Sequence, residues 1–311
     1  MRISEEEARN RLNSGEVIAL PTDTVFGLAV QANNEEALRQ LLAIKKRPTC
    51  KPFVTLLSRR PRLRDFLRKS IYLPSDFRVC IDAFWPGPCT MLLPKSKLSD
   101  TYSIYPSFLG FSGFRVPYHP DLQTFLDKTG NLVVSSANIS GDFPAVSCEE
   151  VENTFGKDFP CLDFGTNRTI GLESTIIKIT SNNIEIMREG LLPFEEVCLV
   201  CGQPELKCTN IYMKKSVKQI SWINPNEIHR NEGLLLGFSN RDYPSWPNHL
   251  AWGNDSSIED VLSNFYPVLR GAFASFFNEI FLDSDWPKGS PLWEVLRRKL
   301  LGLTYRNGNG L

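Results

Sequence analysis

Apolar positions along the chain follow two periods, one typical of strands and one typical of helices. The short apolar runs at 17–20 and 131–134 predict buried strands, whereas apolar residues spaced by three and four predict a helix over 34–44. Ser4 followed by Glu7 is a capping-box pattern, which predicts a helix that begins there and reaches about Asn13. Further strands are predicted at 53–57, 89–94, 113–116, 174–179, 184–187, 233–238, 249–253 and 279–283, and further helices near 60–70, 75–84, 122–128, 146–155, 258–270 and 291–301.

The order of these elements predicts an α/β fold, a twisted mixed sheet with helices packed on it. Asn182-Asn183 separates two apolar strands and predicts a hairpin. A chain of 311 residues holds one large or two medium domains, and 42% hydrophobic residues suffice for real cores. We expect a first domain over 1–203, a linker over 204–217, and a smaller α/β domain over 218–311.

Charge is balanced overall but concentrated locally. The formal net charge is zero, so no global attraction to nucleic acid or a membrane surface is expected. Residues 39–69, however, hold eleven Lys or Arg and one acid, Asp65. One interpretation of this stretch is an RNA-binding module that contacts phosphates without chemistry, although only Phe53 and Phe66 could stack on bases.

Two features of the sequence bear on location. No apolar stretch approaches the ~20 residues that span a bilayer, and the N-terminus shows no signal-peptide pattern, so we expect a cytoplasmic protein. The eight cysteines lie in apolar surroundings and are expected to be buried thiols of a reducing compartment. Cys198 and Cys201 with Cys208 leave a metal site as an alternative, although a fourth ligand is missing nearby and the segment around them has the composition of a strand.

Six polar strings abut the predicted strands, and hydroxyls, amides and cations so placed can be aimed at one polar ligand. Arg47 and Lys51 could bind phosphate oxygens, although cations after a helix are also common as solvated helix ends. An arginine that ends a strand face, such as Arg188, requires an anionic partner or lies at the surface. Ser136 and Asn138 could bind an anion or a base edge, or could form a turn. The six strings are 20–24, 45–48, 115–117, 135–138, 173–175 and 187–190.

Several of these strings resemble motifs of the YrdC/TsaC family of threonylcarbamoyl-AMP synthases, in the family order over about residues 1–200. They read GEVIALPTDTVFGL at 15–28, IKKRPTCKP at 44–52, SSANISG at 135–141, GLESTI at 171–176 and IMREG at 186–190. The resemblance implies the YrdC-like fold. Residues 256–270, 279–283 and 289–300 are more loosely similar to the appended domain of the longer family members.

The resemblance also implies a reaction: L-threonine, bicarbonate and ATP give threonylcarbamoyl-AMP and pyrophosphate, without a covalent protein nucleophile. A partner threonylcarbamoyl transferase then modifies tRNA, which this chain meets indirectly or weakly. Mg²⁺ is expected with ATP, held mostly by the phosphates, and Glu173 is a lower-ranked metal candidate. The ATP-binding residues implied are Lys45, Arg47, Lys51, Ser136, Asn138 and Arg188, and the threonine-binding residues implied are Thr24, Arg115 and Ser174.

The chain departs from the family pattern at two places. Leu56 stands where many members carry His, so one threonine contact is expected to be lost or replaced. The longer members have a His-Tyr-Ala-Pro linker, whereas residues 206–217 read LKCTNIYMKKSV. A carbamoyl-transfer domain of hydrogenase maturation shares the fold, but we expect the synthase because the modules attached to that domain are absent from this sequence.

Overall fold

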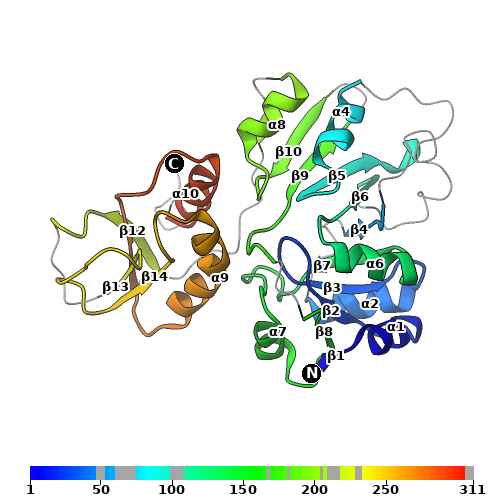
Figure 1. The fold of residues 1–311 in the computed structure, drawn as a ribbon, viewed down its shortest axis with the longest axis horizontal. Helices are drawn as coiled ribbons and strands as arrows, with labels where there is room; N and C mark the ends of the chain where they lie inside the picture. Colours follow the sequence, from blue (N-terminus) through cyan, green and yellow to red (C-terminus); the bar gives the residue numbers. More distant parts are fainter. Residues whose placement is uncertain are drawn as a thin grey trace. The chain divides into compact units, whose positions relative to one another are not determined.

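The computed structural model divides into two compact units (Figure 1). It describes residues 1–46, 53–59, 75–98, 107, 109–165, 169–180, 183–203, 206–208, 218–227 and 233–304. The first unit comprises Met1–Ser140, Pro144–Thr169 and Glu173–Ile211. The second comprises Gly141–Phe143, Ile170–Leu172 and Tyr212–Leu311. Two short segments that lie within the sequence range of the first unit therefore belong to the second unit.

The first unit is built on a mixed sheet, as predicted. Its order is β1-β8-β2-β3-β7-β4-β6-β5-β9-β10-β11, with antiparallel pairs such as β2 with β3 and parallel pairs such as β4 with β6. The strands are β1 (Arg2–Ile3), β2 (Ile18–Leu20), β3 (Gly27–Gln31), β4 (Val54–Leu56), β5 (Cys89–Pro94), β6 (Phe111–Arg115), β7 (Leu132–Ser136), β8 (Cys161–Leu162), β9 (Thr175–Ile179), β10 (Ile184–Arg188) and β11 (Lys207–Cys208).

Local capping signals start several helices of this unit. The Ser4 hydroxyl accepts a hydrogen bond from Glu7 N at 3.3 Å, and the Asn34 side chain accepts from Ala37 N at 3.0 Å. The predicted helix starts at Ser4 and near Asn34 are confirmed. The helices are α1 (Glu5–Asn13), α2 (Glu35–Ile44), α4 (Ser75–Phe84), α6 (Pro120–Thr129), α7 (Cys148–Phe155) and α8 (Phe194–Cys201), with a 3₁₀ turn η1 (Lys95–Lys97).

Alternation along the strands places a core on each face of the sheet. Ile18 and Leu20 pack with residues of α1 and α6, whereas Val17 and Ala19 pack with residues of α2 and α7. A third core joins α4 and α8 to β5, β9 and β10. The sheet is thereby covered by helices on both faces around β2 and β3, and its polar loops are held on rigid strands.

Two predictions about local structure have opposite outcomes. The strands β9 and β10 pair antiparallel, which confirms the predicted hairpin. The segment around Cys198 and Cys201 was expected to be a strand, and this was wrong, because it forms α8. Pro193 precedes this helix and Gly202 ends it in a left-handed conformation, so the boundary signals outweigh the apolar composition. The predicted helix near 60–70 lies outside the described residues.

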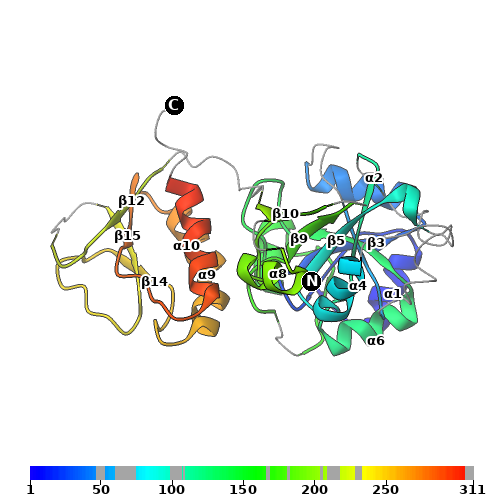
Figure 2. The same ribbon diagram turned by 90° about the horizontal axis from the view of Figure 1, so that it is seen from above.

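The second unit is a smaller α/β unit, as expected. Its four strands pair in parallel in the order β12-β15-β13-β14. Both helices lie on the same side of this sheet (Figure 2). The elements are β12 (Gln219–Ile223), β13 (Leu234–Gly237), β14 (His249–Ala251), α9 (Ile258–Ala274), β15 (Glu279–Asp283) and α10 (Pro291–Thr304).

Helix α9 contacts the two short segments, Gly141–Phe143 and Ile170–Leu172, that join the second unit from earlier in the chain. The ring of Phe143 lies 5.9 Å from that of Tyr266 and 5.1 Å from that of Phe273, and the Phe143 carbonyl accepts from Arg270 at 3.3 Å. The backbone of Gly171 approaches the helix so closely that a Cβ there would lie 2.3 Å from a main-chain oxygen of α9. Both segments are therefore fixed by specific packing.

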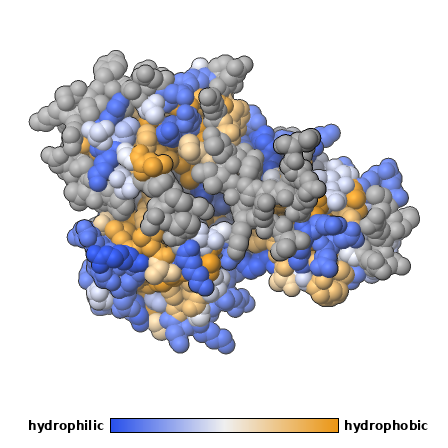
Figure 3. Space-filling view, turned by 180° about the vertical axis from the view of Figure 1, so that it is seen from behind, coloured by the Kyte–Doolittle hydropathy of each residue, from blue (hydrophilic) through white to orange (hydrophobic). Residues whose placement is uncertain are grey.

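Figure 3 shows one face of the molecule, on which hydrophilic and hydrophobic residues are intermixed. Within the described ranges, no helix combines the length and the apolar character needed to cross a membrane. Among the described residues, the large hydrophobic side chains that are exposed are Val79, Leu109, Tyr118, Ile170, Leu199 and Phe276.

Most of the cysteines are buried thiols, as expected, and Cys208 is exposed, which the sequence did not predict. The Cys161 thiol donates to Cys148 at 2.7 Å, and this contact raises the pKa of Cys161 and lowers the pKa of Cys148. Cys80 and Cys201 also lie in contact, at 3.2 Å between their sulfurs. The described thiols other than Cys208 are therefore part of the cores, while Cys50 lies outside the described residues.

The end of β10 predicts a sharp dependence of stability on one glycine. A Cβ at Gly190 would lie 2.1 Å from the Glu173 carbonyl oxygen, which is backbone and cannot move aside. We expect Gly190→Ala to lower the free energy of unfolding by about 1–3 kcal/mol. Gly271→Ala is the control, since its Cβ would meet only Leu250 at 3.6 Å, and alanine in a helix should raise stability by about 0.5–1 kcal/mol. Thermal unfolding followed by circular dichroism measures both, and equal effects of the two variants would contradict the prediction.

Candidate active site

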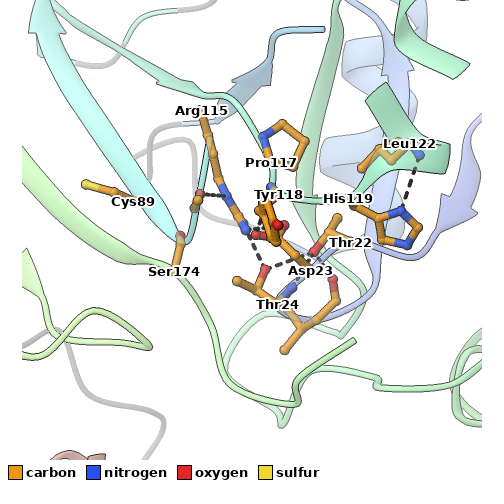
Figure 4. A network of polar contacts seen from close by, with 12 residues as sticks. Thr22, Asp23, Thr24, Cys89, Arg115, Pro117, Tyr118, His119, Leu122 and Ser174 are labelled. Atoms are coloured by element: carbon orange, nitrogen blue, oxygen red, sulfur yellow. Dashed lines mark hydrogen bonds and ion pairs between the residues drawn. The ribbon is translucent and has the colours of Figure 1, made fainter. Parts of the chain in front are cut away.

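Arg115, the last residue of β6, lies at the centre of a buried polar cluster (Figure 4). Its guanidinium forms an ion pair with Asp23 and donates to the Thr24 hydroxyl at 2.8 Å, and both partners lie in the loop between β2 and β3. The side chains of Arg115 and Asp23 are only 5% and 6% exposed. Tyr118 N donates to the second Asp23 oxygen at 3.1 Å. We call Thr22, Asp23, Thr24 and Arg115 the Arg115 cluster.

The partners in this cluster determine the direction of its hydroxyl groups. The Thr22 hydroxyl donates to the Val25 carbonyl at 2.7 Å and lies 2.9 Å from the Thr24 hydroxyl. Arginine can only donate, so Thr24 accepts from Arg115 and gives its own hydrogen to Thr22. One lone pair of the Thr24 oxygen is then left. Thr24 can therefore accept a hydrogen bond from a ligand, such as one from an amine or a hydroxyl.

The segment 87–89 links Arg115 to the beginning of β9. Arg115 Nε donates to the Gly87 carbonyl at 3.1 Å, and the next carbonyl, of Pro88, accepts from Thr175 N at 2.9 Å. Ser174 accordingly lies near the guanidinium in Figure 4, whereas the Cys89 thiol points away from it. Burial raises the pKa of the Cys89 thiol, although the charge of Arg115 acts in the opposite direction. Cys89 is thus a neutral thiol near neutral pH.

Ser174 forms a second cluster with Thr90 and Arg188. Arg188 Nε and Nη2 donate to the Ser174 carbonyl at 3.1 and 2.9 Å, and the Ser174 hydroxyl lies 2.9 Å from that of Thr90. The neighbouring Thr175 hydroxyl accepts from Gly190 N at 2.8 Å. Ser174 is therefore held by side chains from β5 and β10. We call Thr90, Ser174 and Arg188 the Ser174 cluster.

Lys45 forms a third cluster with Ser136 and Asn138. Its side chain is buried, and its ammonium donates to the carbonyl oxygens of Ser136 and Asn138 and to the Asn138 side chain, at 2.9 and 3.1 Å for the two Asn138 contacts. The Ser136 hydroxyl donates to the same Asn138 side chain at 2.6 Å. This Lys45 cluster adjoins the Arg115 cluster, because the Phe26 carbonyl, two residues after Thr24, accepts from Ala137 N at 2.7 Å.

The candidate residues from the sequence fall into these three clusters. The structure brings Thr24 to Arg115, and it brings the threonine candidate Ser174 to the ATP candidate Arg188. Lys45 was expected to face phosphates, and in this structure its ammonium donates hydrogen bonds to the Ser136–Asn138 loop. Arg47 and Lys51 lie outside the described residues. The assignment of each residue to ATP or threonine stays a prediction.

Sequence reasoning missed Thr22, Asp23 and Thr90. The first two stand inside the string at 20–24, but the ion-pair partner of Asp23 lies about ninety positions away, and no local pattern names it. Thr90 lies in an apolar strand and gives no signal at all. Leu56 is buried in an apolar cluster with residues such as Phe125, so the position where many family members carry His belongs to a core here.

Metal-ligating groups give no site within the described ranges. No set of three or more His, Cys, Asp or Glu side chains is arranged there to hold a metal ion. Glu173 is buried, and its carbonyl accepts from Leu191 N at 2.9 Å. Cys198 and Cys201 are buried, whereas Cys208 is exposed on β11. These residues therefore do not form a group that could hold a metal in this structure.

Comparison of the sequence with known proteins identifies relatives. The chain is 31% identical over 193 residues to a threonylcarbamoyl-AMP synthase of Pyrococcus abyssi, a match that spans 62% of this chain and 55% of that protein. It is 35% identical over 187 residues to the threonylcarbamoyl-AMP synthase of Vibrio parahaemolyticus, over 60% of this chain and 98% of that protein. This sequence match thus spans little more than half the length of the Pyrococcus relative.

Solved structures show the same fold over nearly the whole chain. P. abyssi Sua5 complexed with L-threonine matches with a TM-score of 0.78 at 21% identity, over 98% of both chains. A doubly substituted variant of the same protein matches with a TM-score of 0.80 at 21% identity, over 98% of this chain and 96% of that chain. The family model described as "Sua5_yciO_yrdC: Telomere recombination" matches residues 10–190. The chain belongs to this Sua5–YciO–YrdC family.

Proposed function

We propose that this chain is an L-threonylcarbamoyladenylate synthase, which makes threonylcarbamoyl-AMP and pyrophosphate from L-threonine, bicarbonate and ATP. Relatives of at least 30% identity carry the name of this enzyme. The observation that carries the proposal is the Arg115 cluster. In it a buried cation lies next to the Thr24 hydroxyl, which can only accept a further hydrogen bond and not donate one. An amino acid with a carboxylate and an amine offers the complementary groups.

The threonine site follows from these donors and acceptors. Arg115 uses three of its five N–H groups on Gly87, Thr24 and Asp23, which leaves one on each terminal nitrogen for a substrate carboxylate. Thr24 accepts a hydrogen bond from the amine or the hydroxyl of threonine. Ser174, beside Arg115, supplies a further hydroxyl. These residues bind and orient the substrate.

The ATP site would lie toward Arg188 and the basic string at 45–51. Arg188 is half-buried and is already oriented by Ser174, so its remaining donors can bind phosphate oxygens. Arg47 and Lys51 would add charge there, and Lys45 would hold the Ser136–Asn138 loop against the nucleotide. Mg²⁺ that accompanies ATP would be held mostly by the phosphates themselves.

The chemistry requires two steps. The ammonium of threonine loses a proton to solvent, the resulting amine attacks bicarbonate, and loss of water gives a carbamate. A carbamate oxygen then attacks the α-phosphorus of ATP, and the bond to the β-phosphate breaks to release pyrophosphate. Catalysis would come from positioning and charge stabilisation. Cys89 is no nucleophile in this scheme, because burial raises the pKa of its thiol.

The product has a defined use within the proposed function. A threonylcarbamoyl transferase would consume threonylcarbamoyl-AMP and transfer the group to tRNA, in the cytoplasm, where buried reduced thiols are common. The alternative of an RNA-binding module without chemistry has no support from the relatives, which are named as synthases. It also leaves the buried Arg115 cluster without a role.

The choice of substrate tests this function directly. Pyrophosphate release from ATP should require threonine and bicarbonate together. Alanine should lower kcat/KM by roughly a hundredfold or more, because buried groups that bind the threonine hydroxyl would be left unpaired. The measurement follows pyrophosphate and the adenylate product together, with serine as the control that keeps the hydroxyl. Equal turnover of alanine and threonine would rule out the assignment.

The two arginines are predicted to have different ligands. Arg115→Lys should weaken threonine binding by roughly tenfold to a hundredfold, since lysine keeps the charge but loses the two-pronged contact. Arg188→Lys should weaken ATP binding more than threonine binding. Arg59→Lys is the matched control, because that side chain is 82% exposed and pairs only with Asp127 among the described ion pairs. Calorimetry with each ligand decides, and an Arg115→Lys variant that loses ATP but binds threonine normally would contradict the assignment.

A further inference from the structure

Asp23 is a buried carboxylate to which the proposed mechanism gives no task. Its side chain is 6% exposed and forms an ion pair with Arg115, and its second oxygen accepts from Tyr118 N at 3.1 Å. Figure 4 shows it at the guanidinium, next to Thr24. A carboxylate at the residue that is to receive a substrate carboxylate reduces the attraction for that group. Its presence there therefore calls for a physical explanation.

The contacts of Asp23 give it a geometric task first. Asp23, Thr24 and Gly87 each bind a different nitrogen of Arg115, so the guanidinium plane is fixed from three sides. The remaining N–H groups, one on each terminal nitrogen, then point in set directions. Asp23 is itself fixed by the backbone at Tyr118. This makes Asp23 a positioning residue for Arg115.

The charge of Asp23 has a second consequence. Arg115 and Asp23 together are neutral, and in a buried place an uncompensated charge is costly. A zwitterionic amino acid adds no net charge to this pair. A hydroxy acid with the same carboxylate but no amine adds one negative charge that nothing in the Arg115 cluster balances. The neutral pair thus favours a ligand that carries its own cation.

We propose that Asp23 determines the amino-acid specificity of this site, because it cancels the charge of Arg115 and so favours a zwitterion over a plain carboxylate anion. The proposal rests on the proposed function to the extent that Arg115 receives the substrate carboxylate. Asp23→Asn keeps the size of the side chain and an acceptor oxygen for Arg115, but it removes the negative charge and replaces the oxygen that accepts from Tyr118 N with an NH2 group. The variant therefore separates the charge of Asp23 from the size of its side chain, and the ratio of the two affinities, rather than either affinity alone, reports the charge.

The test compares two ligands by calorimetry in the absence of ATP. One is L-threonine, and the other is 2,3-dihydroxybutanoate of the same configuration, which has a hydroxyl in place of the amine. The wild type should bind threonine more tightly, by roughly tenfold to a hundredfold, the range expected for one charged interaction. Asp23→Asn should lower this preference by about tenfold or more. Arg115→Lys is the control, since it should weaken the binding of both ligands and keep the ratio of their dissociation constants.

Each result has a distinct meaning. If Asp23 had only a structural role, Asp23→Asn would weaken the binding of both ligands equally. An unchanged ratio of the two dissociation constants, in a variant with the circular dichroism of the wild type, overturns the proposal. Equal affinity of the wild type for the two ligands also overturns the proposal. This measurement does not depend on whether any variant folds. If the wild type binds neither ligand, the proposed function fails together with this inference. Threonine binding with an unchanged ratio leaves the proposed function intact.

Discussion

A buried cation must be surrounded by acceptors that are fixed in place, because removing a charge from water costs several kcal/mol unless it is paired. Arg115 and Lys45 are such cations in the first unit, and each one fixes a loop. Arg115 binds the loop at 22–24, and Lys45 binds the loop at 136–138. The half-buried Arg188 does the same for the main chain at Ser174. The positions of the polar loops therefore follow from the need to satisfy these charges.

This constraint explains why the clusters stand at the ends of strands. Arg115 and Ser136 are the last residues of β6 and β7, and Arg188 is the last residue of β10. The strands before them are packed against apolar cores and supply rigid supports. A polar side chain that follows such a strand has few conformations open to it. Little conformational entropy is then lost when a ligand binds.

Much of the fold could be predicted because local signals and burial agree. Apolar runs gave the strands of the first unit, and residues such as Ser4 and Asn34 marked helix starts that the structure confirms. The segment at Cys198 was misjudged because apolar composition suits a buried helix as well as a strand. The two-residue strands β1, β8 and β11 have no period to detect. The polar strings located the candidate site, but the partners of Asp23 and Thr90 depend on tertiary contacts, which no local pattern contains.

The discontinuous division of the chain has a consequence for its architecture. The chain passes from one unit to the other after Ser140, Phe143, Thr169, Leu172 and Ile211. Two domains that simply follow one another in the sequence need only one such passage. Phe143 packs on α9 and is only five residues from Asn138. A chain that ended at residue 211 would keep Phe143 but lose α9, so Phe143 would have no partner to pack on. Neither unit therefore corresponds to one continuous stretch of sequence.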